Sequence, residues 1–266
     1  MADSVYISSS LTKDQLLFLQ LLNEKEVEYF TIYGIEEQLS HSFSNINEVL
    51  ENLVHKNFIY RLQKGYYAVK SFNNQNVIGT FISQNSAVAY WSALNIHGLT
   101  SRFPNKVFIQ TTKRKKDKTI LGVHYQFVTI PERKRVGITS LGYGNNSYAI
   151  TDIEKTIIDC FDLSIYSGGF DLLLSAFSLA KLNSNKMIEY AEAVNNLSVT
   201  KRLGFLSELL NKKGLQTFIK YAKLKVNKKY TLIDSAGKDS GEFILNWRLR
   251  LNVSMNEIVN LSKELY

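Results

Sequence analysis

The sequence holds one cysteine and two prolines in 266 residues, and each scarcity excludes a class of protein. A single cysteine, Cys160, provides neither a disulfide framework nor a cysteine-rich zinc site, so a reducing compartment is the default. With only Pro104 and Pro131, the chain is not linker-rich or disordered. The N-terminus lacks a basic segment followed by an apolar one, so we see no secretory signal and expect a cytoplasmic protein.

Residues 71–101 contain no Asp, Glu, Lys or Arg. A membrane-spanning helix needs about 20 predominantly apolar residues, and amide and hydroxyl side chains interrupt this stretch, so we expect no membrane partner. The pattern instead predicts a buried core helix over 83–96. Ser83 or Asn85 would cap its start and Gly98 would end it.

The net charge of +8 is unevenly distributed along the chain. Residues 1–70 hold six Lys/Arg and nine Asp/Glu, whereas residues 102–135 hold ten basic residues and two acidic ones. Residues 136–266 hold sixteen basic and thirteen acidic residues. Basic clustering over 102–135 indicates nucleic acid or another acidic partner. A solvated surface is the alternative.

The first seventy residues predict three helices followed by a hairpin. Helices are expected over 12–25, 31–39 and 45–55, with capping pairs Thr12–Gln15 and Asn45–Glu48 at the first and third. The apolar period then changes to two, which predicts strands over 58–62 and 66–69.

This order is typical of a winged helix-turn-helix, which we assign to residues 1–70. Its third helix would enter the major groove and its hairpin would contact phosphates. The residues predicted to touch DNA are Ser42, Ser44, Asn45, Asn47, Arg61 and Lys64. Because this module is net acidic, it is either a weak DNA binder alone or a protein-contact module.

Strands are predicted over 106–112 and 123–130, with a basic loop between them at the tip of a strand pair. A second basic cluster would lie at the opposite end of the second strand. Charged side chains of this density face water or a polyanion. The candidate phosphate contacts are Lys113, Arg114, Lys115, Lys116, Lys118, Arg133, Lys134 and Arg135.

The remaining chain is predominantly helical and returns to strand near its end. Thr151 and Glu154 have capping-box spacing at the start of a helix over 151–161. Further helices are expected over 169–181, 185–197 and 199–212, strands over 230–233 and 243–253, and a last helix from Ser254. The fold class is therefore α+β: an N-terminal winged helix-turn-helix, then a mixed α/β body with an antiparallel sheet and a helical cluster.

No familiar catalytic or phosphate-binding motif is present. The four histidines have no ligand spacing, and Cys160 lies on an apolar helix face. Asp152, Glu154, Lys155 and Asp159 form the one cluster that could mimic a metal nuclease, although helix capping explains the first two more economically. We expect no enzyme, no cofactor and no metal, and keep a metal-dependent nuclease as an alternative.

Several short motifs resemble those of the AbiEi family of antitoxins, from type IV toxin–antitoxin systems that act in abortive infection. They occur in the family's order between Leu11 and Val253. The motifs are Gly65-Tyr66-Tyr67, Ser92-Ala93-Leu94, His97-Gly98-Leu99-Thr100, Ile153-Glu154-Lys155-Thr156-Ile157-Ile158-Asp159, Gly168-Gly169, Arg202-Leu203-Gly204-Phe205-Leu206 and Asn246-Trp247-Arg248-Leu249.

The resemblance implies a transcriptional regulator that binds double-stranded DNA at its own promoter and represses it. It also implies an antitoxin that counteracts a nucleotidyltransferase-like toxin without requiring a stable complex. Residues 71–77 would be a hinge and residues 78–266 the antitoxin body. The alternative is a protein-docking regulator without specific DNA binding.

Overall fold

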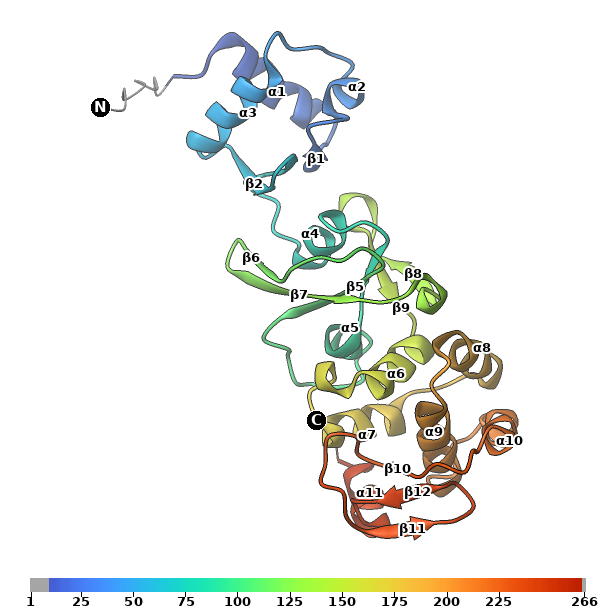
Figure 1. Cartoon of the computed structure of the whole chain (residues 1–266). Coiled ribbons are helices and arrows are strands. Elements are labelled where there is room, and N and C mark those ends of the chain that lie inside the picture. The colour runs from blue at the N-terminus through green and yellow to red at the C-terminus, as the bar shows by residue number, and fades with distance from the viewer. Residues whose placement is uncertain (1–9, 265–266) are drawn as a thin grey trace. The chain divides into compact units, whose positions relative to one another are not determined.

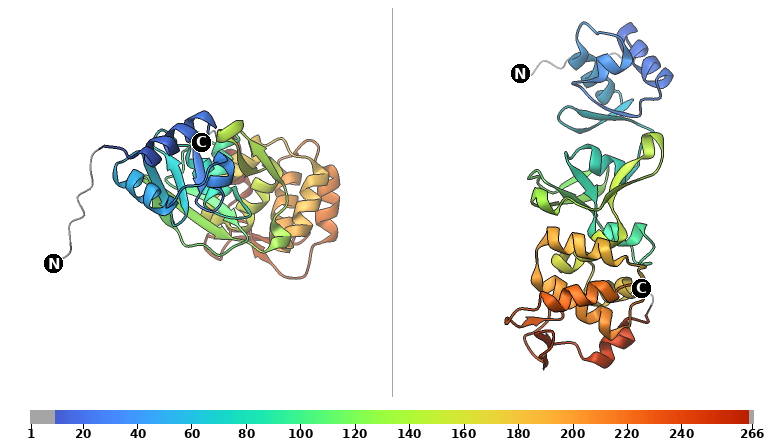
Figure 2. Two further views of the ribbon diagram at one scale, coloured as in Figure 1. Left: turned by 90° about the horizontal axis from the view of Figure 1, so that it is seen from above. Right: turned by 90° about the vertical axis from the view of Figure 1, so that its right-hand side faces the viewer.

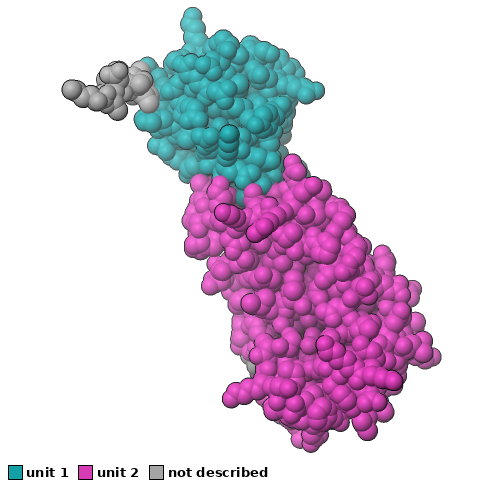
Figure 3. All heavy atoms as spheres, viewed as in Figure 1, with its two compact units in different colours: residues 1–82, 142–147 teal, residues 83–141, 148–266 magenta. Residues whose placement is uncertain are grey.

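The computed structural model describes residues 10–264, which have an α+β fold with eleven α-helices and three β-sheets. The chain forms two compact units (Figure 3). Unit 1 comprises residues 1–82 with the loop 142–147, and unit 2 comprises residues 83–141 and 148–266. Among the described residues, none of the helices has the length and apolar character needed to cross a bilayer.

Unit 1 consists of four helices and one three-stranded sheet (Figure 1). The helices are α1 (Lys13–Glu24), α2 (Ile35–Leu39), α3 (Ile46–His55) and α4 (Gln75–Phe81). The strands are β1 (Tyr29–Thr31), β2 (Ile59–Gln63) and β3 (Tyr66–Val69). They pair antiparallel in the order β1-β3-β2, and the predicted hairpin is confirmed as β2 and β3.

Local capping fixes where α1 and α3 begin, as predicted. Thr12 and Gln15 each accept a hydrogen bond from the other's backbone N–H, at 3.3 and 3.2 Å. Asn45 Oδ1 accepts from the backbone N–H of Glu48 at 3.2 Å. The apolar faces of these helices pack on an aromatic core in which Phe18 meets Phe30 and Phe43 edge to face.

The segment predicted as one helix over 31–39 is a strand followed by a shorter helix. Thr31 ends β1, which pairs with β3 through Phe30 and Tyr67, and α2 begins only at Ile35. Local propensity does not reveal this strand, because its partner lies far along the chain.

The uncharged stretch is not a single helix, so the prediction of a core helix over 83–96 is wrong. It contains strand β4 (Ser86–Val88) and helix α5 (Tyr90–Ile96), and α4 covers part of the predicted hinge. Two non-glycine residues with positive φ, Asn85 (49°) and Tyr90 (54°), flank the strand. Because β4 is buried in the middle of a sheet, its continuous apolar run cannot be told from a buried helix by periodicity.

The larger sheet of unit 2 has six strands in the order β6-β7-β5-β4-β9-β8. Besides β4, these are β5 (Val107–Thr111), β6 (Lys118–Ile120), β7 (Val123–Thr129), β8 (Ile138–Leu141) and β9 (Tyr148–Thr151). β5 pairs antiparallel with β4 but parallel with β7. The sheet is therefore mixed, which corrects the predicted antiparallel sheet.

Six further helices and a small second sheet complete unit 2. The helices are α6 (Ile153–Asp162), α7 (Phe170–Leu179), α8 (Ser184–Val194), α9 (Leu197–Leu209), α10 (Gln216–Leu224) and α11 (Met255–Leu261). The strands are β10 (Thr231–Leu232), β11 (Glu242–Ile244) and β12 (Leu249–Leu251), in the order β10-β12-β11. Helices α7, α9 and α10 lie between the two sheets (Figures 1 and 2), and one continuous core joins Phe108 to Leu249.

Most of the predicted helices of this unit are confirmed, as α6, α7, α8, α9 and α11. The N-cap of α6 is Asp152, not Thr151, because Thr151 is the last residue of β9. Helix α10 is absent from the sequence prediction. The strand predicted over 243–253 divides into β11 and β12, which form an antiparallel pair.

Candidate nucleic-acid interface

Contacts of Phe43 hold the turn before α3 in place, while the polar side chains of the turn remain exposed. The backbone N–H of Phe43 donates to Glu36 Oε1 at 2.7 Å, and the buried Phe43 ring packs against Phe18. On either side of this anchor, Ser42 and Ser44 are exposed. The turn therefore presents two hydroxyls at the N-terminal end of α3.

Asn45 and Asn47 are exposed at the start of α3. Asn45 has a structural role as well, because its Nδ2 donates to Glu48 Oε2 at 3.1 Å while its Oδ1 caps the helix. Next to this end lies a cavity of about 320 Å³ between the starts of α1 and α3. Lys13, Asp14 and Glu48 are among its lining residues, so the cavity carries both signs of charge.

The hairpin carries two exposed basic residues, and one of them already forms an ion pair. Arg61 on β2 pairs with Glu51 on α3, with 2.9 Å between Nη1 and Oε1. Lys64 lies exposed in the turn, followed by Gly65 at φ 80°. Arg61 therefore has an acidic partner on α3 that a phosphate contact would replace.

The basic segment 113–118 is not the tip of a strand pair. Since β5 and β7 are parallel neighbours, the chain leaves β5 and returns as β6 on the far side of β7. Lys115 Nζ lies 5.1 Å from the Phe127 ring centroid, and burial lowers the pKa of Lys115. Lys118 is the exposed first residue of β6. The remaining basic residues of the segment, also exposed, are Lys113, Arg114 and Lys116.

Residues 133–135 leave the sheet at the same end as residue 113, not at the opposite end as predicted, because Thr111 and Thr129 pair in parallel register. Arg133 Nη1 donates to the carbonyls of Ala193 and Val194, at 2.6 and 2.8 Å, and so holds the C-terminal end of α8. Lys134 forms an ion pair with the buried carboxylate of Asp162. Arg135 is exposed. Two of these three basic residues therefore stabilise unit 2.

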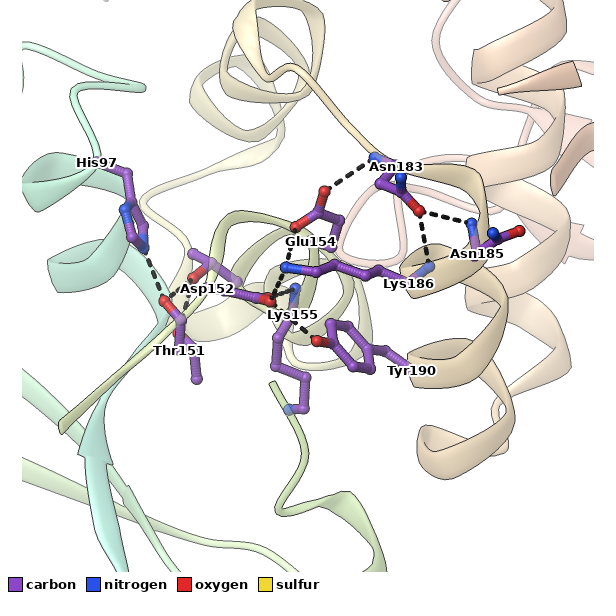
Figure 4. Close-up of polar contacts among 10 residues, drawn as sticks. His97, Thr151, Asp152, Glu154, Lys155, Asn183, Asn185, Lys186 and Tyr190 are labelled. Atoms are coloured by element: carbon purple, nitrogen blue, oxygen red, sulfur yellow. Dashed lines mark hydrogen bonds and ion pairs between the residues drawn. The ribbon is translucent and has the colours of Figure 1, made fainter. Parts of the chain in front are cut away.

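The acidic cluster at the start of α6 is occupied by protein partners (Figure 4). Asp152 Oδ2 accepts from Tyr190 Oη and from Lys186 Nζ, both at 2.9 Å, while Oδ1 accepts from the backbone N–H of Lys155. Burial and the bond to Asp152 raise the pKa of Tyr190 well above its usual value. Asp152 thus ties α6 to α8.

The other members of the predicted nuclease cluster are also engaged. Glu154 Oε1 accepts from the backbone N–H of Asn183 at 2.8 Å. Asp159 is buried with Lys155 in an ion pair one helical turn apart, and its pKa is raised because desolvation outweighs the attraction of Lys155. Burial also raises the pKa of Cys160 well above its usual value. Within the described residues, no group of three His, Cys, Asp or Glu could hold a metal ion.

His97 has a structural contact as well, because its Nε2 lies 2.7 Å from the carbonyl oxygen of Thr151 (Figure 4). This bond joins the end of α5 to the end of β9. His97 is the C-cap residue of α5.

The sequence interpretation missed a second basic region. Residues 209–233 contain seven lysines and no Asp or Glu. The balanced total for 136–266 concealed this run, and a charge count in a shorter window would have found it.

No known protein-family model matches this chain, and no curated protein matches it. Among solved structures, the crystal structure of the RV2827C protein from Mycobacterium tuberculosis is similar, with a TM-score of 0.64 over 97% of each chain. The sequence identity is 12%, so the similarity shows a shared fold alone.

Proposed function

We propose that this protein is a DNA-binding transcriptional regulator, with unit 1 acting as a winged helix. The observation that carries the proposal is the element order α1-β1-α2-α3-β2-β3 together with the sheet order β1-β3-β2. In winged helices the helix that follows the turn enters the major groove and the hairpin flanks it. In this proposal helix α3 and the β2–β3 hairpin take these roles.

The start of α3 carries side chains suited to reading base edges. The amide of Asn47 matches the donor and acceptor of adenine in the major groove, and the hydroxyls of Ser42 and Ser44 suit either bases or phosphates. Lys64 in the wing suits a phosphate. Asn45 is a weaker reader, because its amide already contacts Glu48.

Unit 1 alone has too little positive charge for strong binding. Residues 1–70 include six Lys/Arg and nine Asp/Glu, and phosphate neutralisation supplies most non-specific affinity. In this proposal the exposed cations of unit 2 supply that affinity, above all Lys113, Arg114 and Lys116. Lys115, Arg133 and Lys134 serve packing and ion pairing instead.

The antitoxin role rests on the resemblance to the AbiEi family, and we propose it on that basis. The protein would repress its own promoter and counteract a nucleotidyltransferase-like toxin without a stable complex. Co-expression with the product of the neighbouring gene tests this role. If growth is still rescued after deletion of residues 1–70, the remaining chain neutralises the toxin. If the full chain does not rescue growth, the antitoxin role is contradicted.

The DNA-binding proposal is tested with a duplex from the protein's own upstream region and a scrambled duplex of equal length. We expect a salt-sensitive preference for the upstream duplex. Asn47→Ala should weaken that preference by about 1–3 kcal/mol, the range for one bidentate base contact. Because Asn47 is exposed, Asn47→Ala should unfold at the same temperature as the wild type, which separates lost binding from lost folding.

The same assay separates DNA binding from protein docking. Equal affinity for the two duplexes, or no shift of either, contradicts the proposal. Failure to bind DNA combined with toxin neutralisation that needs Glu48 and Glu51 would support the protein-docking alternative.

A further inference from the structure

The outer face of the small sheet in unit 2 is unusually rich in aromatic and cationic side chains. Leu249 and Leu251 of β12 are buried in the core, so Arg250 between them lies on the opposite face. Arg248, the residue before β12, has a φ of 50° and lies over the Tyr230 ring. Arg250 pairs in register with Leu232 of β10 and with Phe243 of β11. The face therefore presents Arg250 of the central strand beside neighbours from both flanking strands.

Rings and guanidinium groups contact one another on this face. The Tyr230 and Phe243 rings meet edge to face with centroids 4.8 Å apart. The Arg248 Cζ lies 5.3 Å from the Tyr230 centroid, and the Arg250 Cζ lies 5.0 Å from the Phe243 centroid. Phe243 nonetheless remains 55% exposed and Leu245 68% exposed. Large exposed apolar side chains grouped in this way indicate an interaction site.

A lysine-rich loop is held beside the same sheet. The buried Lys201 Nζ donates to the carbonyls of Lys229 and Arg248, at 2.6 and 3.3 Å, and to Asn227 Oδ1 at 3.2 Å. These bonds tie the loop before β10 to the residue before β12. Lys228 and Lys229 are exposed on that loop. Lys201 is thus a positioning residue, which fixes two surface lysines near Arg248.

We propose that this face, formed by Tyr230, Phe243, Arg248, Arg250, Lys228 and Lys229, binds single-stranded nucleic acid. Unstacked bases stack on exposed aromatic rings and arginine planes, while nearby cations contact the phosphates. In a duplex the faces of the bases are stacked on one another, so an exposed ring of the protein cannot stack on them. This site is separate from the duplex-binding surface of unit 1 and does not depend on it.

The neighbouring acidic residue is compatible with this role. Arg250 Nη1 lies 2.6 Å from Asp239 Oδ1, and the Asp239 side chain is 78% exposed. Exposed ion pairs contribute little free energy, so a phosphate can replace this carboxylate. An anionic membrane fits less well, because it offers headgroup charges but no planar bases on which the exposed rings can stack.

The test uses the full chain and fluorescein-labelled 12-nucleotide oligo(dU) and oligo(U) at low salt. We expect both to bind, and the ratio of the two affinities to report any contribution of the 2′-hydroxyl. Phe243→Ala and Phe243→Leu should weaken binding about 10-fold, because both lose the stacking ring. Phe243→Tyr retains the ring and should bind like the wild type.

The lysines are tested through salt dependence. Replacing Lys228 and Lys229 together by alanine should make the slope of log affinity against log salt less negative by about 1.4. The charge-matched control replaces the exposed Lys181 and Lys213, which line a cavity of unit 2 away from this face, and should leave affinity for the oligonucleotides near the wild-type value.

Three outcomes overturn the inference: no oligonucleotide binding by the wild type, equal binding by the Phe243 variants, or binding to phosphatidylglycerol vesicles without binding to oligonucleotides. The duplex assay for unit 1 is run on the same proteins. Phe243→Ala should leave duplex binding unchanged, so failure of this inference is distinguishable from failure of the proposed function.

Discussion

The two units use their charged residues differently. Among the described residues, those with buried charged side chains all belong to unit 2: Glu154, Lys155, Asp159, Asp162, Lys201 and Arg202. Unit 1 has an aromatic and aliphatic core and keeps pairs such as Arg61–Glu51 at its surface. A basic residue in unit 2 therefore has to be located before it is counted as a contact for nucleic acid.

The number of charged residues in a unit therefore does not tell how many of them can contact a partner. Unit 1 is net acidic, yet none of its described charged residues is buried, and most are exposed and can rearrange around a partner. Unit 2 has more cations, but Lys134, Lys201 and Arg133 are committed to Asp162 or to backbone carbonyls. Exposed cations of unit 2 remain in residues 113–118, along α10 and around the outer face of the small sheet.

The largest difference between the units is expected when a charged pair is broken. Lys155→Ala leaves the buried Asp159 without its partner and should lower the free energy of unfolding by about 3–5 kcal/mol. Arg61→Ala breaks the exposed pair in unit 1 and should lower it by only about 0–1 kcal/mol. Urea unfolding of the full chain measures both.

The double variant Lys155→Met/Asp159→Leu is the control, because it removes both charges and retains much of the volume. It should recover most of the stability lost in Lys155→Ala. Equal losses for Lys155→Ala and Arg61→Ala would contradict the contrast between the units.

A second comparison concerns packing at a glycine in each unit. A Cβ at Gly204 in α9 would lie 2.5 Å from the Trp247 ring and 2.6 Å from Ala222 Cβ. Overpacking in Gly204→Ala should therefore lower the free energy of unfolding by about 1–3 kcal/mol. The better helix propensity of alanine should restore about 1 kcal/mol of this loss.

Gly34 in unit 1 is the matched control for this substitution. A Cβ at Gly34 would have Thr31 Oγ1 as its nearest neighbour, at 4.0 Å, and the φ of Gly34 is −131°. Gly34→Ala should change stability by no more than about 0.5 kcal/mol. Thermal unfolding of both variants measures this difference. A higher unfolding temperature for Gly204→Ala than for Gly34→Ala would contradict the packing argument.

A small effect that depends on pH is expected from an exposed carboxylate of unit 2. Glu208 accepts hydrogen bonds from Lys223 and, at 2.7 Å, from Trp247 Nε1, and these lower its pKa, with the Lys223 bond the larger cause. Its stabilising contribution is present above the unfolded pKa of about 4.3 and is lost as the pH falls through the folded value.

Glu208→Gln should therefore lower the free energy of unfolding by about 0–1 kcal/mol near pH 7. It should not change the free energy of unfolding once the pH is below the folded pKa. Urea unfolding from pH 7 down to pH 3 measures this difference. A difference between variant and wild type that grows as the pH falls has the wrong sign for a lowered pKa and would contradict the assignment.

Short-range signals make much of unit 1 predictable. The capping pairs of α1 and α3 involve residues three apart, and the period-two pattern of β2 and β3 is equally local. Sequence does not predict β1, because it is a strand only through its pairing with β3. The prediction for the uncharged stretch is wrong for the same reason, since β4 is a strand because β5 and β9 flank it.

The candidate site is predictable only as far as residue type. Sequence identifies Lys134 as basic, but Asp162, its partner, lies 28 residues away. The carbonyls that engage Arg133 are 60 and 61 residues away. The parallel pairing of β5 and β7 likewise decides where residues 113–118 lie. Such partners depend on tertiary structure and have no local signature.

The most direct test of the division of roles is the salt dependence of binding to the upstream duplex. Lys113, Arg114 and Lys116 are replaced together by glutamine, and the exposed Lys181, Lys213 and Lys238 are replaced together as the charge-matched control. If each of the first three contacts one phosphate, the slope should become less negative by about 2.7 while the preference for the upstream duplex persists. An unchanged slope, or loss of that preference, would contradict the account in which unit 1 reads sequence and unit 2 supplies affinity.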